Sequence, residues 1–421
     1  MSLRRIISDL SDAVFVRNKV STEFEVTKWL MKNPDKPVIF QNINGCEVVG
    51  NLWSTRERIA RFLGIEKREI MKKLLAAIEN PVSPVKIENP PFREKIIEKV
   101  DLRKLPIPKW FPNDGGRYIT SAVAVAEYKG KRNLSFHRLM LIDRNRMAIR
   151  LVPRHLFTMY KSSIEENEEL QVAFCIGVCP TILLSAATSV PFEQDELNIA
   201  SSLRKTCTGE PLEVAETENG ITVPAHSEII LEGKITRNTT EEGPFVDITG
   251  TYDQKRIQPV VEIERIYMSP HPLFHIILPG GLEHYLLMGL PREPLIYRSV
   301  SQVVPKVHGV RLTEGGCCWL HGVVSITKNR EGDGVNAILA AFSGHPSMKK
   351  VIVVDEDIDI YNDREVEWAI ATRFQASRGL VIINNAGGSS LDPSSSEVTS
   401  KMGIDATKPY RATGFERVKL D

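Results

Sequence analysis

The sequence lacks the motifs that mark several large enzyme classes. Its 421 residues contain no G-x-G-x-x-G stretch, no phosphate-binding Walker loop and no G-x-S-x-G motif. These absences argue against a Rossmann-type NAD enzyme, a P-loop NTPase and an α/β-hydrolase. Asp355, Asp357 and Asp359 have the spacing of a calcium loop, but Ile360 and Val366 occupy the positions where that loop needs Gly and Glu. The pattern therefore excludes an EF-hand.

Net charge and long apolar runs are also scarce. The chain carries 54 Lys and Arg against 53 Asp and Glu, so its net charge of +1 creates no long-range field for nucleic acid or an anionic membrane. No apolar run approaches the ~20 residues of a membrane span. Residues 1–14 contain neither the apolar core nor the cleavage site of a signal peptide. We therefore expect a cytoplasmic protein that binds no nucleic acid and does not span a membrane.

Cysteine is rare and carries no metal-binding pattern. The six cysteines form no C-x-x-C pair and no zinc signature. We expect buried thiols in a reducing compartment.

What is present indicates a large α+β protein. The length allows two or three domains, and the 42% hydrophobic and 25% charged fractions are typical of a globular protein. Helices and strands alternate up to a proline-rich segment at 80–113, strands with inserted helices dominate 117–270, and alternation returns after 304. The middle part predicts a barrel-like β domain. A Gly/Ser-rich loop at 387–400 and a polar tail from Lys401 end the pattern.

An acidic corner between residues 240 and 250 is the most distinctive stretch of the chain. Glu242 and Asp247 lie five positions apart, around a Gly243-Pro244 pair. In a straight strand these positions would point to opposite faces. Because Gly243 frees the backbone and Pro244 fixes it, a bend here could turn both carboxylates into one cavity. Two carboxylates so close need a cation between them or a shared proton.

A single arginine offers that cation. Strand alternation from Leu134 to Ile142 places apolar side chains on one face, where Arg138 is the only charge. A guanidinium there must be paired, and two carboxylates suit its forked donors. The spacing alone leaves two interpretations open: a catalytic network, or a structural salt bridge beside an acidic surface turn.

A second set of residues could hold a metal. Asn133, His155 and Glu196 offer an amide oxygen, an imidazole and a carboxylate. This mixed, hard ligand set suits Mn²⁺ or Mg²⁺ better than structural zinc. By spacing alone, three such residues over 63 positions would ordinarily be noise.

Four stretches together resemble the UbiD family of decarboxylases, which use prenylated FMN. They are Asn-x-Ser-x-x-Arg at 133–138, Pro-Arg-His at 153–155, Glu-Gly-Pro-Phe-x-Asp at 242–247 and Lys-Met-Gly-Ile-Asp-Ala-Thr at 401–407. The resemblance runs in the family's order from about residue 120 to 410. It implies a UbiD-like α+β fold with three parts: an N-terminal α/β domain (1–112), a central split β-barrel that binds the flavin (113–300) and a C-terminal α/β domain with a cofactor-contacting loop and tail (301–421).

The resemblance also implies roles for individual residues. Asn133, His155 and Glu196 match ligands of a divalent metal, usually manganese, that holds the flavin phosphate, and Lys401 matches a lysine that contacts the same phosphate. The family's potassium site would fall in segment 185–190, but this segment departs from the family's pattern, because Ala186 and Ala187 supply no side-chain oxygens. The full set of expected cofactor-binding residues is Asn133, Ser135, Phe136, His137, Arg138, Arg154, His155, Glu196 and Lys401.

Arg138, Glu242 and Asp247 match the family's catalytic network beside the isoalloxazine. Loss of CO₂ from an sp² carbon leaves a carbanion, and no side chain is a good electron sink for it, so a cofactor must take that charge. Arg138 would orient the substrate carboxylate, Glu242 would hold Arg138, and Asp247 is the favoured general acid.

The family resemblance fixes the reaction class better than the substrate. The chain looks most like archaeal members that decarboxylate trans-anhydromevalonate 5-phosphate to isopentenyl phosphate. His137, Arg154 and His284 are candidates for the substrate phosphate, each with a structural role as the plainer interpretation. An aromatic acid such as 4-hydroxy-3-polyprenylbenzoate is the alternative substrate.

An interpretation from a different class is a non-catalytic cofactor-binding or assembly subunit. The presence of Arg138, Glu242 and Asp247 speaks against it, because a scaffold would not need them. The resemblance further implies a flavin prenyltransferase as cofactor supplier and a homo-oligomer, dimeric or hexameric.

Overall fold

The computed structural model divides into two compact units. It describes residues 3–8, 10–395, 398–415 and 417–418. The first unit comprises the chain up to residue 67 together with 76–287, and the second comprises 68–75 together with 288–421. The three-domain division expected from the sequence stays a prediction beside this partition. Among the described helices, none has both the length and the apolarity needed to cross a bilayer.

The first unit begins with a small mixed sheet in the order β1-β2-β3-β18. Its strands are β1 (Val14–Val16), β2 (Val38–Ile43), β3 (Cys46–Gly50) and β18 (Leu273–Ile276). Asn44 and Gly45 both have positive φ, which suits the tight turn joining β2 to β3. Three helices accompany this sheet: α1 (Leu3–Ser8), α2 (Glu25–Lys32) and α3 (Arg56–Leu63). The cap of α3 is Thr55, whose side chain accepts a hydrogen bond from the Arg58 amide.

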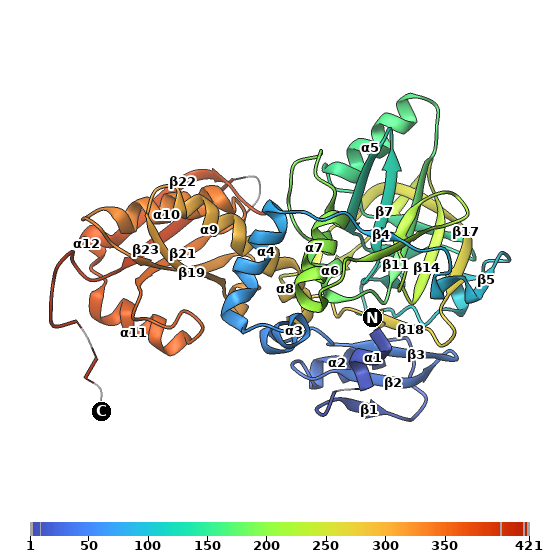
Figure 1. The fold of residues 1–421 in the computed structure, drawn as a ribbon, viewed down its shortest axis with the longest axis horizontal. Coiled ribbons are helices and arrows are strands. Elements are labelled where there is room, and N and C mark those ends of the chain that lie inside the picture. Colours follow the sequence, from blue (N-terminus) through green and yellow to red (C-terminus); the bar gives the residue numbers. More distant parts are fainter. Residues whose placement is uncertain (1–2, 9, 396–397, 416, 419–421) are drawn as a thin grey trace. The chain divides into compact units, whose positions relative to one another are not determined.

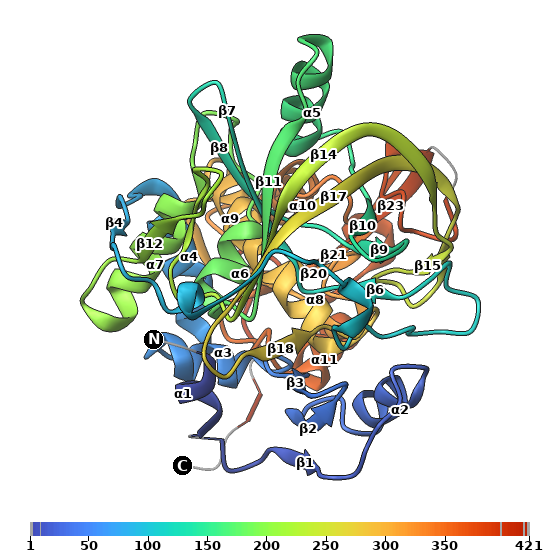
Figure 2. The same cartoon turned by 90° about the vertical axis from the view of Figure 1, so that its right-hand side faces the viewer.

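A nine-stranded sheet forms the main body of the first unit, and every pairing in it is antiparallel. Eight strands follow the order β6-β9-β10-β17-β14-β11-β7-β8, and β5 pairs with β17. They are β5 (Lys95–Ile97), β6 (Tyr118–Ile119), β7 (Val123–Tyr128), β8 (Lys131–Phe136), β9 (Leu139–Leu141), β10 (Arg146–Ile149), β11 (Leu170–Ile176), β14 (Ile229–Glu242) and β17 (Arg256–Met268). Figure 1 and Figure 2 show β14 and β17 as long neighbouring strands that arch together.

This sheet must curl strongly, although its ladder stays open. Strand β8 lies at one end of the order and β9 lies next to the other end. Only His137 and Arg138 separate them, and three Cα steps span at most about 11 Å. The two ends of the sheet are therefore drawn together without a closing ladder among the described strands. A strand-rich central region with inserted helices is confirmed, whereas its description as a split barrel is not.

The break between β8 and β9 corrects a prediction. The alternating pattern from Leu134 to Ile142 predicted one continuous strand, but the chain leaves the ladder at His137 and Arg138. Strand β8 pairs with β7, whereas β9 pairs with β6 and β10. The two strands bury their apolar side chains in different places: Leu139 and Met140 of β9 belong to the large core around Phe174, whereas Leu134 of β8 is buried without belonging to that core.

Further elements of the first unit surround this sheet. Three helices are inserted between its strands: α5 (His155–Glu165), α6 (Pro180–Ala186) and α7 (Glu196–Thr208). Two small sheets complete the unit, one of β4 (Val85–Lys86), β12 (Glu213–Glu216) and β13 (Thr222–Pro224), the other of β15 (Phe245–Val246) and β16 (Tyr252–Asp253). The second of these small sheets follows the acidic corner directly.

The second unit contains a five-stranded sheet in the order β19-β20-β21-β23-β22. The strands are β19 (Lys306–Leu312), β20 (His321–Thr327), β21 (Lys350–Asp355), β22 (Leu380–Gly387) and β23 (Val398–Ala406). Strands β20, β21 and β23 run parallel. The connecting helices are α9 (Glu293–Ser301), α10 (Asp333–Gly344), α11 (Asp363–Arg373) and α12 (Ala376–Gly379), while α4 (Ile70–Glu79) and α8 (Leu282–Gly289) cross from one unit to the other. The predicted βαβ-like layer is confirmed.

The polar tail predicted from Lys401 is wrong for residues 401–406. These residues form the second half of β23, paired on one side with β21 and on the other with β22. Gly403 explains the close fit, because a Cβ there would lie 2.2 Å from the Ile338 side chain on α10. The polar composition hid a strand that is held by its neighbours on both sides.

Candidate active site

Arg138 lies at the centre of a cluster of carboxylates. Its Nε and Nη2 donate to the two oxygens of Glu242, at 2.9 and 3.0 Å, in a bidentate pair. Its Nη1 donates to Asp247 at 2.9 Å, and Nη2 also donates to Asp253 at 2.9 Å. The Arg138 side chain is 9% exposed. Burial opposes the charge, but hydrogen bonds and attraction from Glu242 and the other two acids raise the pKa of Arg138, so it stays a cation.

Asp253 brings further arginines to this cluster. It makes an ion pair with Arg256, and the Arg150 Nε lies 3.9 Å from its Oδ2. Burial works against ionisation of Asp253, yet Arg256 and Arg138 hold its pKa below the usual range. Burial and the repulsion of Arg256 and Arg138 lower the pKa of Arg150. The site is therefore a dense network of alternating charge rather than an isolated salt bridge.

The acidic corner itself is formed by a close approach of backbone to backbone. Strand β14 ends at Glu242, Gly243 has φ of 95°, and β15 begins at Phe245. The Gly115 amide donates to the Pro244 carbonyl at 2.8 Å. A Cβ on Gly115 would lie 2.2 Å from the Gly243 carbonyl oxygen, so only glycine fits. The bend turns Glu242 and Asp247 toward the same guanidinium.

Aromatic and imidazole groups surround the network. The Arg138 guanidinium lies 4.7 Å from the centre of the Phe245 ring, and the Gly243 amide donates to the Tyr118 hydroxyl at 3.1 Å. Burial and the Glu242 charge raise the pKa of Tyr118, which therefore stays a neutral phenol. The Gly280 amide donates to His284 Nδ1 at 3.2 Å, and burial lowers the pKa of that imidazole despite the attraction of Asp247.

The structure brings the three expected metal ligands together in a second cluster. Asn133 Nδ2 donates to Glu196 Oε1 at 3.1 Å, and His155 Nδ1 lies 3.5 Å from the same oxygen. The other oxygen of Glu196 accepts from the Leu134 amide at 3.0 Å. Asp195 caps α7 by accepting from the Leu197 amide, and this cap places the buried Glu196 at the first helical position.

The residues between the two clusters are hydrogen-bonded in a chain. Ser135 Oγ lies 2.8 Å from Asn133 Oδ1 and 3.0 Å from His137 Nε2. His137 Nδ1 lies 2.9 Å from the Arg150 carbonyl oxygen. The segment that carries Asn133 at one end therefore carries Arg138 at the other.

The chemistry of the second cluster fits a hard divalent cation. The Asn133 amide and the His155 imidazole both lie close to one oxygen of the Glu196 carboxylate. Together these three side chains supply the ligand types that such a cation prefers. In the described part of the chain, no group of three His, Cys, Asp or Glu residues forms an alternative metal site.

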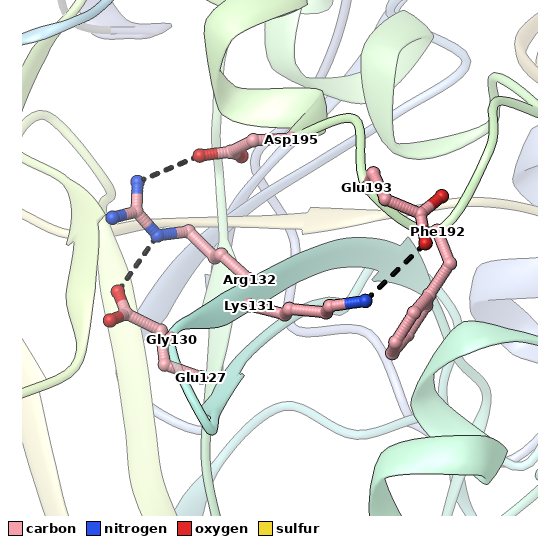
Figure 3. Close-up of a pocket in the computed structure, with 7 residues that line it drawn as sticks. All are labelled: Glu127, Gly130, Lys131, Arg132, Phe192, Glu193 and Asp195. Carbon is pink, nitrogen blue, oxygen red and sulfur yellow. Dashed lines mark hydrogen bonds and ion pairs between the residues drawn. The ribbon is translucent and has the colours of Figure 1, made fainter.

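A pocket of about 340 Å³ opens beside this cluster. Arg132 and Asp195, the sequence neighbours of Asn133 and Glu196, line it, and Phe192 packs on His155 with ring centres 5.2 Å apart. Figure 3 shows Arg132 between Glu127 and Asp195, and Lys131 directed toward Glu193. Burial raises the pKa of Asp195, although Arg132 opposes the shift.

The remaining predicted residues lie in different surroundings. Phe136 ends β8, and Arg154 is exposed and donates to Ser189 Oγ at 2.9 Å. Lys401 belongs to the second unit, where its buried ammonium donates to the Pro346 and Met348 carbonyls, and burial lowers its pKa. In the segment expected to hold potassium, the Ser185 and Thr188 hydroxyls donate to carbonyls of their own helix.

Sequence reasoning missed Asp253, Arg150, Arg256 and Tyr118. A signal for Asp253 existed, because the turn at Thr249-Gly250 predicts a hairpin, and its register pairs Phe245 with Asp253. The others come from distant strands, and nothing local marks them.

Comparison with known proteins agrees with this architecture. Three family models match the chain: the N-terminal domain (8–78), the Rift-related domain (83–282) and the C-terminal domain (285–406) of 3-octaprenyl-4-hydroxybenzoate carboxy-lyase. The chain is 47% identical to the anhydromevalonate phosphate decarboxylase of Methanosarcina mazei and 45% identical to that of Methanocaldococcus jannaschii, each over 99% of both chains.

Solved structures of UbiD-class enzymes show the same fold. The enzyme HmfF from Pelotomaculum thermopropionicum in complex with FMN superposes with a TM-score of 0.96 at 38% identity, over 100% of this chain and 97% of that one. An evolved dimeric form of the same enzyme, in complex with prenylated FMN, gives 0.92 at 36% identity over the same shares. With all three family models matched over most of its length, this chain belongs to the UbiD family of carboxy-lyases.

Proposed function

We propose that this protein decarboxylates trans-anhydromevalonate 5-phosphate to isopentenyl phosphate. Full-length similarity to anhydromevalonate phosphate decarboxylases, at 44–47% identity in four archaeal proteins, supports this substrate. The observation that carries the reaction class is the Arg138 network, in which one cation contacts three carboxylates in a largely buried site.

Arg138 orients the substrate carboxylate. Its guanidinium is fixed by the bidentate contact with Glu242, which is fully buried. A second anion can therefore approach without moving the arginine, and exclusion of water strengthens the attraction. The bond between the carboxylate and the unsaturated carbon then breaks, CO₂ leaves, and the electron pair remains on the carbon side.

Asp247 supplies the proton that replaces CO₂. It is 19% exposed, whereas Glu242 is 0% exposed, and a single contact joins it to Arg138. Its carboxyl group can therefore face substrate while Glu242 keeps the arginine in place. Proton donation from a placed acid contributes ~10²–10⁴ in rate.

Prenylated FMN is the proposed cofactor, and when bound it supplies the electron sink for the carbanion. Asn133, His155 and Glu196 would hold Mn²⁺ or Mg²⁺ against the flavin phosphate, with Lys401 as a further contact and the curled nine-stranded sheet as a split-barrel flavin domain. Potassium in segment 185–190 stays a prediction. A flavin prenyltransferase would supply the cofactor, and the chain would assemble as a dimer or hexamer.

An aromatic acid such as 4-hydroxy-3-polyprenylbenzoate is the second candidate substrate. A phenolic acid decarboxylase of Sedimentibacter hydroxybenzoicus, 32% identical over 88% of this chain, favours keeping it. A non-catalytic cofactor-binding or assembly subunit is the third interpretation, and the Arg138 network speaks against it because such a subunit would not need these charges.

The test is an assay of protein produced with and without a flavin prenyltransferase. We expect flavin absorbance and CO₂ release from trans-anhydromevalonate 5-phosphate in the first preparation, and an inactive second preparation. Preference for a 4-hydroxybenzoate-type acid would replace the proposed substrate, and a coloured protein that releases CO₂ from neither acid would support the non-catalytic interpretation.

A further inference from the structure

The chain of hydrogen bonds from Asn133 to Arg150 has a fixed direction. It runs from the Asn133 amide through Ser135 Oγ and the His137 ring to the Arg150 carbonyl, with separations of 2.8, 3.0 and 2.9 Å. A carbonyl oxygen can only accept, so His137 Nδ1 must carry a proton. The directions of the other two hydrogen bonds, between His137 and Ser135 and between Ser135 and Asn133, depend on the charge of the imidazole.

His137 is held as a neutral imidazole by its surroundings. Its side chain is buried, none of its described hydrogen bonds reaches a carboxylate, and Arg138 follows it directly in the chain. Burial lowers the pKa of His137 to about 4, although the Arg150 carbonyl opposes the shift. With its proton on Nδ1, the neutral ring presents Nε2 as a bare acceptor.

Ser135 has a single hydroxyl proton, and Nε2 requires it. The Ser135 oxygen is then left as an acceptor, so the Asn133 group facing it must be a donor, the amide NH₂. The structure places the Asn133 oxygen toward Ser135 and the nitrogen toward Glu196, but the two atoms exchange places by a half-turn of the amide, and only the hydrogen-bond network assigns them. The amide oxygen of Asn133 therefore points the other way, toward Glu196.

In that orientation two hydrogen-bond acceptors face each other, the Asn133 amide oxygen and the Glu196 carboxylate. The Asn133 atom facing Glu196 lies 3.1 Å from Oε1, and His155 Nδ1 lies 3.5 Å from the same oxygen. An amide oxygen and a carboxylate this close repel each other unless a cation lies between them. We propose that His137, acting through Ser135, is a positioning residue that turns the Asn133 oxygen toward a divalent metal.

This inference rests on the proposed metal site and adds a cause for its ligand geometry. A protonated imidazole would reverse the order, because it would donate to Ser135, and Ser135 would donate to the amide oxygen. The amide nitrogen would then face Glu196, which removes a metal ligand. In this role, His137 acts through its buried, neutral ring and the Ser135 hydroxyl.

The test measures Mn²⁺ affinity in the parent protein and in variants of the Asn133–Ser135–His137 chain. Metal-depleted protein with saturating FMN is titrated with Mn²⁺, and free Mn²⁺ is followed by electron paramagnetic resonance. We expect His137→Leu to weaken binding about tenfold, in the ordinary range for groups that orient a metal ligand. Ser135→Ala should weaken it similarly, and the double variant should lose no more than either single one, because both remove the same relay.

Asn133→Asp provides the decisive control, since a carboxylate presents an oxygen in either orientation. In that background, we expect His137→Leu to change Mn²⁺ affinity less than twofold. His137→Gln, which keeps an acceptor near Nε2, should stay within about threefold of the parent, and thermal melting of each apoprotein checks the fold.

Equal losses from His137→Leu in the parent protein and in the Asn133→Asp background would overturn the inference, because His137 would then act on the fold as a whole. Unchanged affinity in His137→Leu would overturn it too. A parent protein that binds no Mn²⁺ would instead refute the metal site of the proposed function and, with it, this role of His137.

Discussion

At the scale of single residues, Glu242 and Asp247 differ in how tightly each is held by Arg138. Glu242 uses both oxygens and is fully buried, whereas Asp247 uses one and receives the Ile248 amide on the other, at 2.7 Å. The two acids therefore have unequal freedom to face a substrate. This difference supports the assignment of Asp247 as proton donor.

Asp247→Asn tests that assignment. The amide keeps the size of the side chain and a contact to Arg138 but cannot donate a proton as an acid, so we expect kcat to fall about 100-fold or more. Flavin absorbance should be unchanged, because Asp247 is not expected to hold the cofactor. Asp143→Asn, which alters an exposed pair with Arg146, is the matched control. Full turnover in Asp247→Asn would remove this residue from the mechanism.

A second acid near the acidic corner gives a prediction about pH. Asp114 is buried beside Gly115, with Oδ2 accepting from the Phe111 amide at 2.8 Å and Oδ1 without a hydrogen-bond partner. Burial raises its pKa to about 6 from 3.8. The folded state therefore holds this proton more tightly than the unfolded chain, and above pH 6 folding leaves a buried charge. The corresponding cost is at most about 3 kcal/mol.

Asp114→Asn should therefore stabilise the protein more at pH 8 than at pH 5. At pH 5 the folded wild type is already protonated at this position, so the substitution removes no charge. Thermal melting at the two pH values is the measurement. Asp101→Asn is the control, because the Arg103 hydrogen bond lowers the pKa of Asp101 to about 2, so this carboxylate is charged at both pH values. Its replacement should destabilise the protein, and by the same amount at pH 5 and pH 8. A gain for Asp114→Asn that is equal at both pH values would contradict the assignment.

At the scale of elements, the position of Glu242 depends on a contact between two backbone segments, one at Gly115 and the other at Gly243-Pro244. Strand β14 ends where the Gly115 segment crosses the Gly243-Pro244 corner, and a Cβ on Gly115 would meet the Gly243 carbonyl oxygen at 2.2 Å and its carbon at 2.7 Å. Because both atoms belong to the backbone, neither can move without moving the corner.

Gly115→Ala should therefore destabilise the protein by about 1–3 kcal/mol and reduce activity further by displacing Glu242. Gly116→Ala is the matched control, since its Cβ would meet the flexible Met140 side chain at 3.1 Å and the Leu141 carbonyl oxygen at an ordinary contact distance of 3.6 Å. We expect the control to retain most activity. Melting temperature and kcat measured on both variants check this, and equal behaviour of the two would show that the close approach is unimportant.

The elements also show how far local pattern predicts structure. Helix α2, the strands β2 and β3, and the βαβ order of the second unit follow from apolar periodicity, which is set by neighbours in sequence. The break at His137 and Arg138 and the strand at residues 401–406 do not, because each depends on which distant strand is paired beside it. Register between distant segments leaves no mark on local periodicity.

At the scale of the whole molecule, the edge of the second unit carries an exposed apolar face. Strand β22 is an edge strand, and Ile382, directly paired with Met402 of β23, is 60% exposed. Leu380 and Met402 are exposed as well. Edge strands with apolar faces favour pairing with another chain. The proposed self-association of this protein would cover such a surface with a second copy.

Ile382→Lys tests this placement of the interface. We expect the variant to have a lower mass by size-exclusion chromatography with light scattering, because a charge would be buried against its copy. Val85→Lys changes another exposed apolar residue, in the first unit, and should leave the mass unchanged. A monomeric parent protein would refute the proposed oligomer. An Ile382→Lys variant that is still oligomeric would show that the interface does not lie at this strand.

The sequence by itself determined the family, the reaction class and the residues meant to meet: Arg138 with Glu242 and Asp247, and Asn133 with His155 and Glu196. These are motif statements, and motifs are local. Only the tertiary structure decided the rest: the third carboxylate Asp253, the glycine that lets the corner close, and the chain of contacts from Asn133 through Ser135 to His137. These features depend on distances between strands far apart in the chain, and such distances are fixed by packing and register, which no short stretch encodes.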